Sequence, residues 1–319
     1  MEDKINNRLE FIKSRFSAIS FEIVHNCFSP TLKHFIIKDT HGEKGFGSSH
    51  DIEIAIEKSY SEYVERKSFF CLNQFFNNGF KTSNGFAAHT NYKESKISSV
   101  NEIIERDAFL ISWHGSIPPY WLTELETFNL LTPENKLIFK KHFAKSLSLK
   151  VGIIAKTNEI FTCIAKVNIK SSSQNQFYID TKADKDIFVA INGAVESISF
   201  FSHYISKGFK VDFPNNVSLL NSPIDHFLFY LNNNIDMSWY DKGNNNILAL
   251  PLQKMKTYQI PTENILQKTN LERVVTFSEA ENFQDYYCGK FARNQINLKR
   301  FENVLGPNFK LNRLVHPLS

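Results

Sequence analysis

A short acidic pattern is the part of this sequence best suited to chemistry. It reads S-x-x-E-x-x-E-R and comprises Ser59, Glu62, Glu65 and Arg66. Glutamates three residues apart lie on one face of a helix. Carboxylates held close together raise one another's pKa unless a cation lies between them, and Mg²⁺ is a hard cation that prefers oxygen ligands. The pattern therefore indicates a helix that presents acids to Mg²⁺ and to phosphate.

The same pattern recurs at Ser99, Glu102, Glu105 and Arg106, and residues 45–70 align with residues 85–110 without a gap. E-x-x-E-R is also common on solvated helix surfaces, where the arginine offsets the acids by only a few tenths of a kcal/mol. The ungapped duplication favours the functional interpretation. If the two helices pack as pseudo-symmetric partners, their carboxylates can share one Mg²⁺-nucleotide site.

A third, decayed copy is expected at about residues 179–204. Placing Glu196 opposite Glu62 and Glu102 gives a helix with apolar spacing that retains one acid. Ser199 stands where the other copies have their second glutamate.

Strands and further helices must position these acids. Alternating, β-branched runs predict strands at 21–27 and 32–39 and a hairpin over 149–169 that turns at Thr157–Asn158. The prolines in 117–121 end the second repeat helix, and residues 122–146 are expected to be helical. Residues 232–246 predict an exposed, asparagine-rich loop. The chain then ends in an extended segment with His316 expected on the surface.

Composition limits the classes of function. A chain of 319 residues with 42% hydrophobic residues can bury a large core. The net charge of +4 is not gathered into a basic block, which gives nucleic-acid binding little support. Neither a signal peptide nor a membrane span is apparent, and the four cysteines are far apart, which argues against a zinc cluster or a disulfide framework. The expected location is the cytoplasm, without nucleic-acid or membrane partners.

The motifs described above resemble those of the YcaO family. The likeness rests on the first motif, on the glycine-led second copy with Glu94 and E-x-x-E-R-D-A, and on the hairpin and acid-bearing third helix that follow. It implies an α/β (α+β) fold of pseudo-repeated helix-plus-sheet units around a central nucleotide site. The whole of 1–319 is expected to be one such domain, without a fused domain that binds a leader peptide.

The resemblance also implies which residues bind ATP and Mg²⁺. The expected Mg²⁺ ligands are Glu62, Glu65, Glu102, Glu105 and Glu196. The expected ATP contacts are Ser59, Glu62, Arg66, Arg106, Glu196 and Arg293, the last in a late strand. No residue is assigned as the catalytic nucleophile or base.

YcaO proteins phosphorylate a backbone amide oxygen, so the resemblance implies an ATP-dependent cyclodehydratase subunit. It would form thiazoline or oxazoline rings in a ribosomally made precursor peptide, as in bacteriocin biosynthesis. A leader-binding, E1-like protein and a flavin dehydrogenase are the expected partners. Two alternatives stay open: backbone thioamidation with a sulfur-delivering partner, and a degenerate, non-catalytic scaffold. Ser199 in place of the family's usual glutamine and the tail HPLS motivate the second.

Overall fold

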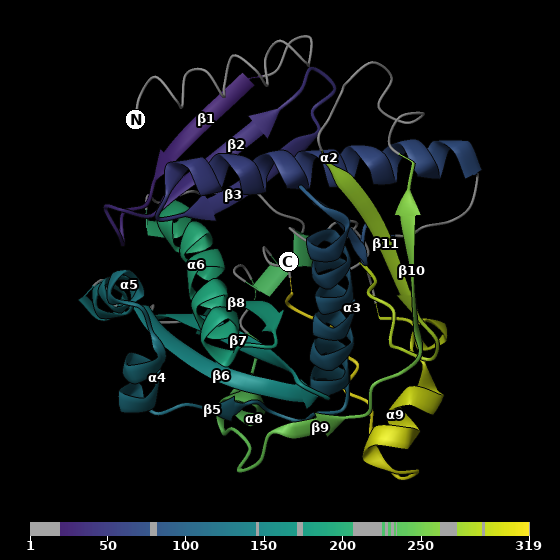
Figure 1. Cartoon of the computed structure of the whole chain (residues 1–319). Coiled ribbons are helices and arrows are strands. Elements are labelled where there is room, and N and C mark those ends of the chain that lie inside the picture. The colour runs from purple at the N-terminus through teal and green to yellow at the C-terminus, as the bar shows by residue number, and fades with distance from the viewer. Residues whose placement is uncertain are drawn as a thin grey trace. The chain divides into compact units, whose positions relative to one another are not determined.

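The computed structural model describes residues 20–76, 82–144, 147–170, 175–206, 225–226, 229–230, 233, 235–261, 273–288 and 291–318 (Figure 1). The chain forms two compact units. Unit 1 comprises 1–26, 30–100 and 256–279, and unit 2 comprises 27–29, 101–255 and 280–319. A single domain over 1–319 stays a prediction. No helix among the described residues combines the length and the apolar character needed to cross a lipid bilayer.

Unit 1 packs one long helix on an antiparallel sheet. The strands β1 (Ser20–His25), β2 (Lys33–Lys38) and β3 (Lys44–Ser49) form that sheet in this order, and α2 (Ile52–Phe76) packs on β2 and β3. The expected strands at 21–27 and 32–39 are thereby confirmed. A second sheet has the order β10 (Met255–Ile260), β11 (Val274–Ala280) and β4 (Phe86–His89). Apolar side chains of α2 such as Ile56 and Val64 join Phe35 and Phe86 in one core.

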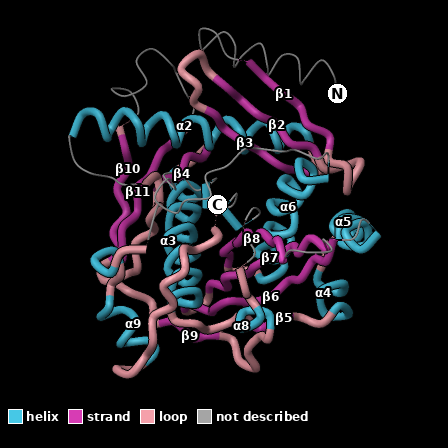
Figure 2. The backbone as a smooth tube through the Cα atoms, turned by 180° about the vertical axis from the view of Figure 1, so that it is seen from behind, coloured by secondary structure: helices cyan, strands magenta, loops and turns pink. Residues whose placement is uncertain are grey.

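Unit 2 is built on the expected hairpin. β6 (Leu147–Thr157) and β7 (Ile160–Lys170) pair antiparallel around Asn158, whose φ of 55° suits the turn. β5 (Tyr120–Trp121) and β8 (Asn175–Asp184) extend the sheet to the order β5-β6-β7-β8, and β9 (Leu248–Leu250) pairs parallel with β6. The helix α6 (Ile187–Ser206) packs on β7 and β8, and Figure 2 shows it running along these strands. The expected helical stretch consists of α4 (Glu124–Leu130) and α5 (Pro133–Ala144).

Two expectations for the C-terminal half are wrong. The asparagine-rich stretch contains a helix, α8 (Ser238–Asp241), because Tyr240 is fully buried against Trp113 and anchors the turn in the core. Residues 315–318, at the end of the described part of the chain, do not lie on the surface. Val315, His316 and Leu318 are buried, and Trp113 Nε1 donates a hydrogen bond to the carbonyl of Leu314 (3.1 Å).

A 3₁₀ turn and a helix also precede the end of the chain. They are η2 (Arg293–Gln295) and α9 (Leu298–Leu305). Asn297 caps α9, because its side chain accepts a hydrogen bond from the N–H of Arg300 (3.2 Å).

The three repeats share one local structure, a strand that leads directly into a helix. β3 precedes α2, β4 precedes α3 (Tyr92–His114), and β8 precedes α6. In each case an aspartate or asparagine just before the helix accepts a hydrogen bond from a first-turn N–H. The bonds run from Glu53 to Asp51 (2.8 Å), from Glu94 to Asn91 (3.0 Å) and from Phe188 to Asp186 (2.8 Å). The third segment thus shares the local geometry of the first two, and its origin as a third repeat stays a prediction.

The register of the third copy differs from the expected one by one residue. Counted from the capping residue, Glu62 follows Asp51 at the same spacing as Glu102 follows Asn91. Ser197, rather than Glu196, has this spacing from Asp186. The helix cap fixes where the helix begins, whereas a single glutamate can be aligned at several places.

Candidate active site

The acids of the first repeat lie on α2 within unit 1. Glu62 Oε2 accepts a hydrogen bond from the N–H of Phe46 (2.8 Å), and Oε1 pairs with Arg66 one turn along the helix (2.5 Å). The guanidinium of Arg66 also lies over the ring of Phe46, 5.5 Å from its centroid. Glu62 and Glu65 raise the pKa of Arg66. The structure therefore brings together Glu62, Glu65 and Arg66 beside β3.

Ser59 holds β3 against α2. Its hydroxyl is fully buried and donates a hydrogen bond to the carbonyl of Gly45 (2.8 Å). A side chain at Gly45 or Gly47 would meet the helix backbone, because an added Cβ would lie 2.1 Å from the Ser59 oxygen or 2.0 Å from the Ala55 oxygen. These glycines allow the strand to pack directly on the helix. The predicted contact of Ser59 with ATP stays a prediction, and the described role of this side chain is packing.

In the second repeat, Glu105 faces the strand β8 within unit 2. It is only 7% exposed. Oε1 accepts from the Thr181 hydroxyl (2.7 Å), and Oε2 accepts from the N–H of Ala183 (3.1 Å). Glu102 is half-buried one turn earlier on the same helix. α3 and β8 thus fix the carboxylate of Glu105 at both oxygens.

Arg106 neutralises part of this acidic region. Burial would lower its pKa, but Glu105, Glu102 and Asp180 more than compensate, so the pKa of Arg106 is raised. Its guanidinium lies 4.9 Å from the centroid of the Tyr286 ring, which fixes one face of the group. The side chain is therefore held among three carboxylates.

Asp180 is a site residue that the sequence analysis missed. It is 8% exposed and lies on β8, where its carboxylate accepts hydrogen bonds from the Ser197 hydroxyl and from the N–H of Thr181 (2.8 Å). Burial, together with the charge of Glu105, raises the pKa of Asp180 to about 6, although Ser197 and Arg106 oppose the shift. Aligning the third repeat by its helix cap places Asp180 opposite Gly45 and Gly85. Because the aligned residues are glycines, the repeat pattern gave no signal for an acid there.

The third helix contributes mainly hydrogen bonds. Glu196 is half-buried, and its Oε1 accepts from Asn135 (3.4 Å). Ser199, where the family's glutamine was expected, is fully buried and donates to the carbonyl of Glu196 (2.7 Å). Asn192 also links α6 to α4 and α5, since its side chain bonds the Leu130 carbonyl and the Thr132 N–H.

The side chains of two other residues named in the sequence analysis, Glu94 and Arg293, make none of the contacts described above. Glu94 is exposed and pairs with His89 (2.5 Å). Arg293 lies in η2 and not in a strand, and it lines a pocket with α9. The strand expected there is replaced by a turn because Ala292 N–H bonds the Gln295 side chain (3.1 Å).

The donor set of unit 2 suits a hard divalent cation. A carboxylate has about four acceptor positions, and Glu105 and Asp180 each use two of them for the hydrogen bonds given above. Within the described part of the chain, no three His, Cys, Asp or Glu side chains form a complete metal site. Mg²⁺ is usually held by one or two carboxylates plus phosphate oxygens, so a pair of acids fits that coordination.

Comparison with known families and structures agrees with this donor chemistry. The family profile described as YcaO cyclodehydratase, ATP- and Mg²⁺-binding, matches residues 68–195. The match includes Glu94, Glu102, Glu105, Arg106 and Asp180, begins after the first motif and ends just before Glu196. ATP and Mg²⁺ are therefore the ligands of the matched family. No curated protein matches the chain.

Solved structures share the fold at low sequence identity. A heterocyclase in complex with substrate and cofactor has a TM-score of 0.68 and 10% identity over 97% of this chain and 57% of that chain. This chain thus spans little more than half of the heterocyclase. YcaO from Methanopyrus kandleri, bound with AMPPCP and Mg²⁺, has a TM-score of 0.61 and 11% identity over 100% of this chain and 96% of that chain.

The E. coli microcin synthetase McbBCD complex gives a TM-score of 0.53 and 10% identity over 83% of this chain and 88% of that chain. The same values hold for that complex with pro-MccB17 bound. Residues 68–195 are similar to the YcaO family, and the mixed helix-and-sheet fold of the chain is that of YcaO structures.

Proposed function

We propose that this protein uses ATP and Mg²⁺ to activate backbone amides of a peptide. The expected products are thiazoline or oxazoline rings in a ribosomally made precursor, with the chain acting as the cyclodehydratase subunit of a modifying complex. The observation that supports this best is the buried pair Glu105 and Asp180, held on α3 and β8 beside Arg106. Two carboxylates near a single arginine are suited to take up a divalent cation.

The chain's own residues then have distinct tasks. Thr181 and the Ala183 N–H hold Glu105 in one orientation, and Ser197 holds Asp180. Such fixed donors and acceptors need little reorganisation when charge develops on a phosphoryl group. We assign Glu62, Glu65, Glu102, Glu105 and Glu196 to Mg²⁺ or triphosphate, and Arg66 and Arg106 to phosphate or to the acids beside them. When bound, ATP supplies the phosphoryl group that makes the amide oxygen a leaving group, and Mg²⁺ neutralises its charge.

The partners follow from the proposed substrate. A leader-binding, E1-like protein would present the precursor, and a flavin dehydrogenase would oxidise the rings. The E. coli complex with pro-MccB17 bound supports a peptide substrate in a multi-protein assembly. A cytoplasmic location fits the supply of ATP.

Two other activities are distinguished by the product. Thioamidation exchanges oxygen for sulfur and adds about 16 mass units, whereas each ring removes one water and about 18 mass units. Ser199 in the third helix favours the third candidate, a scaffold that binds ATP without turnover.

Mass spectrometry of the precursor, after incubation with the chain, partners, ATP and Mg²⁺, tests the proposal. Glu105→Gln is expected to abolish product formation, because it removes a fixed anionic ligand. Glu159→Gln is the matched control, since Glu159 lies on the exposed turn between β6 and β7 and pairs only with Lys185 among the described residues. Equal product yields from Glu105→Gln and the control would contradict the proposed site.

A further inference from the structure

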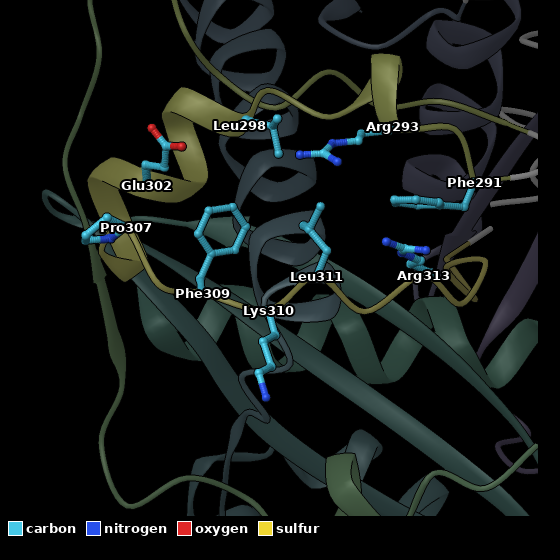
Figure 3. Close-up of a pocket in the computed structure, with 9 residues that line it drawn as sticks. All are labelled: Phe291, Arg293, Leu298, Glu302, Pro307, Phe309, Lys310, Leu311 and Arg313. Atoms are coloured by element: carbon cyan, nitrogen blue, oxygen red, sulfur yellow. The ribbon is translucent and has the colours of Figure 1, made fainter.

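A pocket of about 630 Å³ lies in the C-terminal part of unit 2, formed by one continuous segment of the chain (Figure 3). Residues before and within η2 form one side, α9 forms another, and the loop after α9 closes it. Gly306 ends α9 with a φ of 84° and sends the chain back along the helix. The lining residues are Phe291, Arg293, Leu298, Glu302, Pro307, Phe309, Lys310, Leu311 and Arg313.

The pocket has a firm attachment to the core. Arg300, on the buried face of α9, pairs with Asp107 of α3 (2.6 Å), and both side chains are 1% exposed. Phe301 stacks on Phe309 with ring centroids 5.6 Å apart. The N–H of Asn312 donates to the carbonyl of His114 (2.7 Å). The walls are therefore fixed before any ligand binds, which lowers the entropic cost of binding.

The charge in the pocket is unbalanced. Two arginines, Arg293 and Arg313, face it against one acid, Glu302. Within the described ranges, no carboxylate lies at ion-pair distance from Arg293, Lys310 or Arg313. Figure 3 shows Arg293 and Arg313 on the side of Phe291, Glu302 at the opposite end, and the Lys310 ammonium pointing away from the other lining side chains. One end of the pocket thus attracts anions.

Apolar side chains lie between the charged ends. Leu311 stands next to the two arginines, and Phe309 and Leu298 continue the surface toward Glu302. Inorganic phosphate would leave this apolar surface in water. A ligand that fits must carry an anionic group and an apolar group a few ångströms apart, as an extended acidic peptide does.

We propose that this pocket binds an acidic peptide segment, with carboxylates on Arg293 and Arg313 and an apolar side chain on Leu311 and Phe309. Arg293 thereby serves peptide capture and not the nucleotide. The inference rests on the proposed function in one respect: a peptide-modifying protein has a reason to bind a peptide. The binding itself requires no ATP. Bidentate arginine–carboxylate contacts supply both strength and orientation.

Fluorescence anisotropy with a rhodamine-labelled peptide, Asp-Leu-Asp-Phe-Asp, tests the proposal on the full chain. Saturable binding is expected, and the Asn-Leu-Asn-Phe-Asn analogue should bind at least about tenfold more weakly. Arg293→Gln combined with Arg313→Gln should lower the affinity by a similar factor. Lys310→Gln is the matched control and should stay within about twofold, because its ammonium points away from the pocket.

Three outcomes would overturn the inference: absence of binding to the folded chain, equal affinity for both peptides, or an unchanged affinity in the double variant. Displacement of the peptide by ATP and Mg²⁺ would also overturn it, since it would assign the arginines to the nucleotide. ATP binding measured in parallel distinguishes a failure of the peptide-binding pocket from a failure of the proposed function. If ATP binds and the peptide does not, the pocket assignment fails while the proposed function stands.

Discussion

Asp107 and Arg300 form an ion pair that is almost completely removed from solvent, with 2.6 Å between Oδ2 and Nη2. Asp107 belongs to the second repeat helix, directly after Glu105 and Arg106, and its Oδ1 also accepts from the N–H of Gln284 (2.8 Å). The guanidinium of Arg300 lies 4.7 Å from the centroid of Phe283 and donates to the Pro251 carbonyl (3.1 Å). This pair connects the acidic helix to the wall of the pocket.

Removing one partner of this pair should destabilise unit 2 strongly. Asp107→Asn or Arg300→Met leaves a buried charge without its counterion, which typically costs about 3–5 kcal/mol. Asp107→Asn combined with Arg300→Met should cost clearly less than the sum of the two single changes. Urea unfolding of the four proteins measures this, and strictly additive losses would show that the two charges do not depend on each other.

The carboxyl of Asp180 should give a pH-dependent stability of its own. Its folded pKa of about 6 lies above the unfolded value, so the folded state holds an extra proton between about pH 4 and pH 6. The contribution of this proton to the free energy of unfolding is on the order of 2–3 kcal/mol. It is complete below the unfolded pKa and is lost as the pH rises through 6. Asp180→Asn should remove this dependence, as seen in the difference between the two unfolding curves.

ATP and Mg²⁺ should reverse that shift, since a nearby cation favours the ionised carboxylate. Binding near pH 6 is then expected to release protons from the wild-type protein and fewer from Asp180→Asn. Calorimetric titrations in buffers of different ionisation enthalpy count these protons. Identical proton release by both proteins would remove Asp180 from the site.

Buried histidines should make unit 2 sensitive to acid. Burial lowers the pKa of His114 to about 4, and it lowers the pKa of His226 and His316 as well. The tautomer of His114 is fixed, because its Nδ1 donates to the Asn312 carbonyl (2.8 Å) and its Nε2 accepts from the Tyr287 hydroxyl (2.8 Å). The contribution of these neutral histidines to the free energy of unfolding is complete above the unfolded pKa, and it is lost as the pH falls from about 6.5 toward 4.

This loss opposes the contribution of Asp180 and involves three groups instead of one, so the net stability should fall on acidification. His114→Gln keeps a donor and an acceptor but cannot be protonated. Its unfolding free energy should lose about 3 kcal/mol less than that of the wild type between pH 6.5 and pH 4. Parallel pH profiles for the two proteins would contradict the proposed burial of a neutral His114.

The close approach of β3 to α2 should make Gly47 intolerant of a side chain. The Cβ of Gly47→Ala would lie 2.0 Å from the Ala55 carbonyl oxygen, which is backbone and cannot move aside. A loss of at least about 3 kcal/mol is expected. The control is Gly193→Ala in α6, where the nearest atom is Lys182 Cγ (2.9 Å) on an exposed side chain and helix propensity gains about 1 kcal/mol. Thermal unfolding should separate the two variants clearly.

The repeats and the hairpin could be predicted because their signals are local. Glu62 and Glu102 lie at the same distance in sequence from the start of their helices, because the two helices begin at the same point of the repeat. Asn158 suits the turn that joins β6 to β7. The third copy was placed one residue out of register because Glu196 alone was used, while the capping Asp186 carries the geometric information.

Other features could not be read from local patterns because they depend on contacts between distant segments. Asp180 is a site residue only through burial beside Glu105, and His316 is buried only because Tyr287 and His226 bind it. In α9, the buried face carries Arg300 where an amphipathic helix pattern would have an apolar residue. The sequence pattern therefore did not indicate a helix, because the ion pair of Arg300 with Asp107 is not apparent from the sequence.

The segment from Leu314 to Leu318, which is buried from Val315 on, has a consequence for synthesis. Its residues hydrogen-bond Trp113 and Tyr286, and Leu318 bridges to Ile179 on β8. The ribosome makes roughly 5–20 residues per second, so α3 waits roughly 10–40 seconds for this segment to be made. During that interval Trp113 lacks its hydrogen-bond acceptor at Leu314. These contacts of unit 2 can therefore form only after Leu318 has left the ribosome.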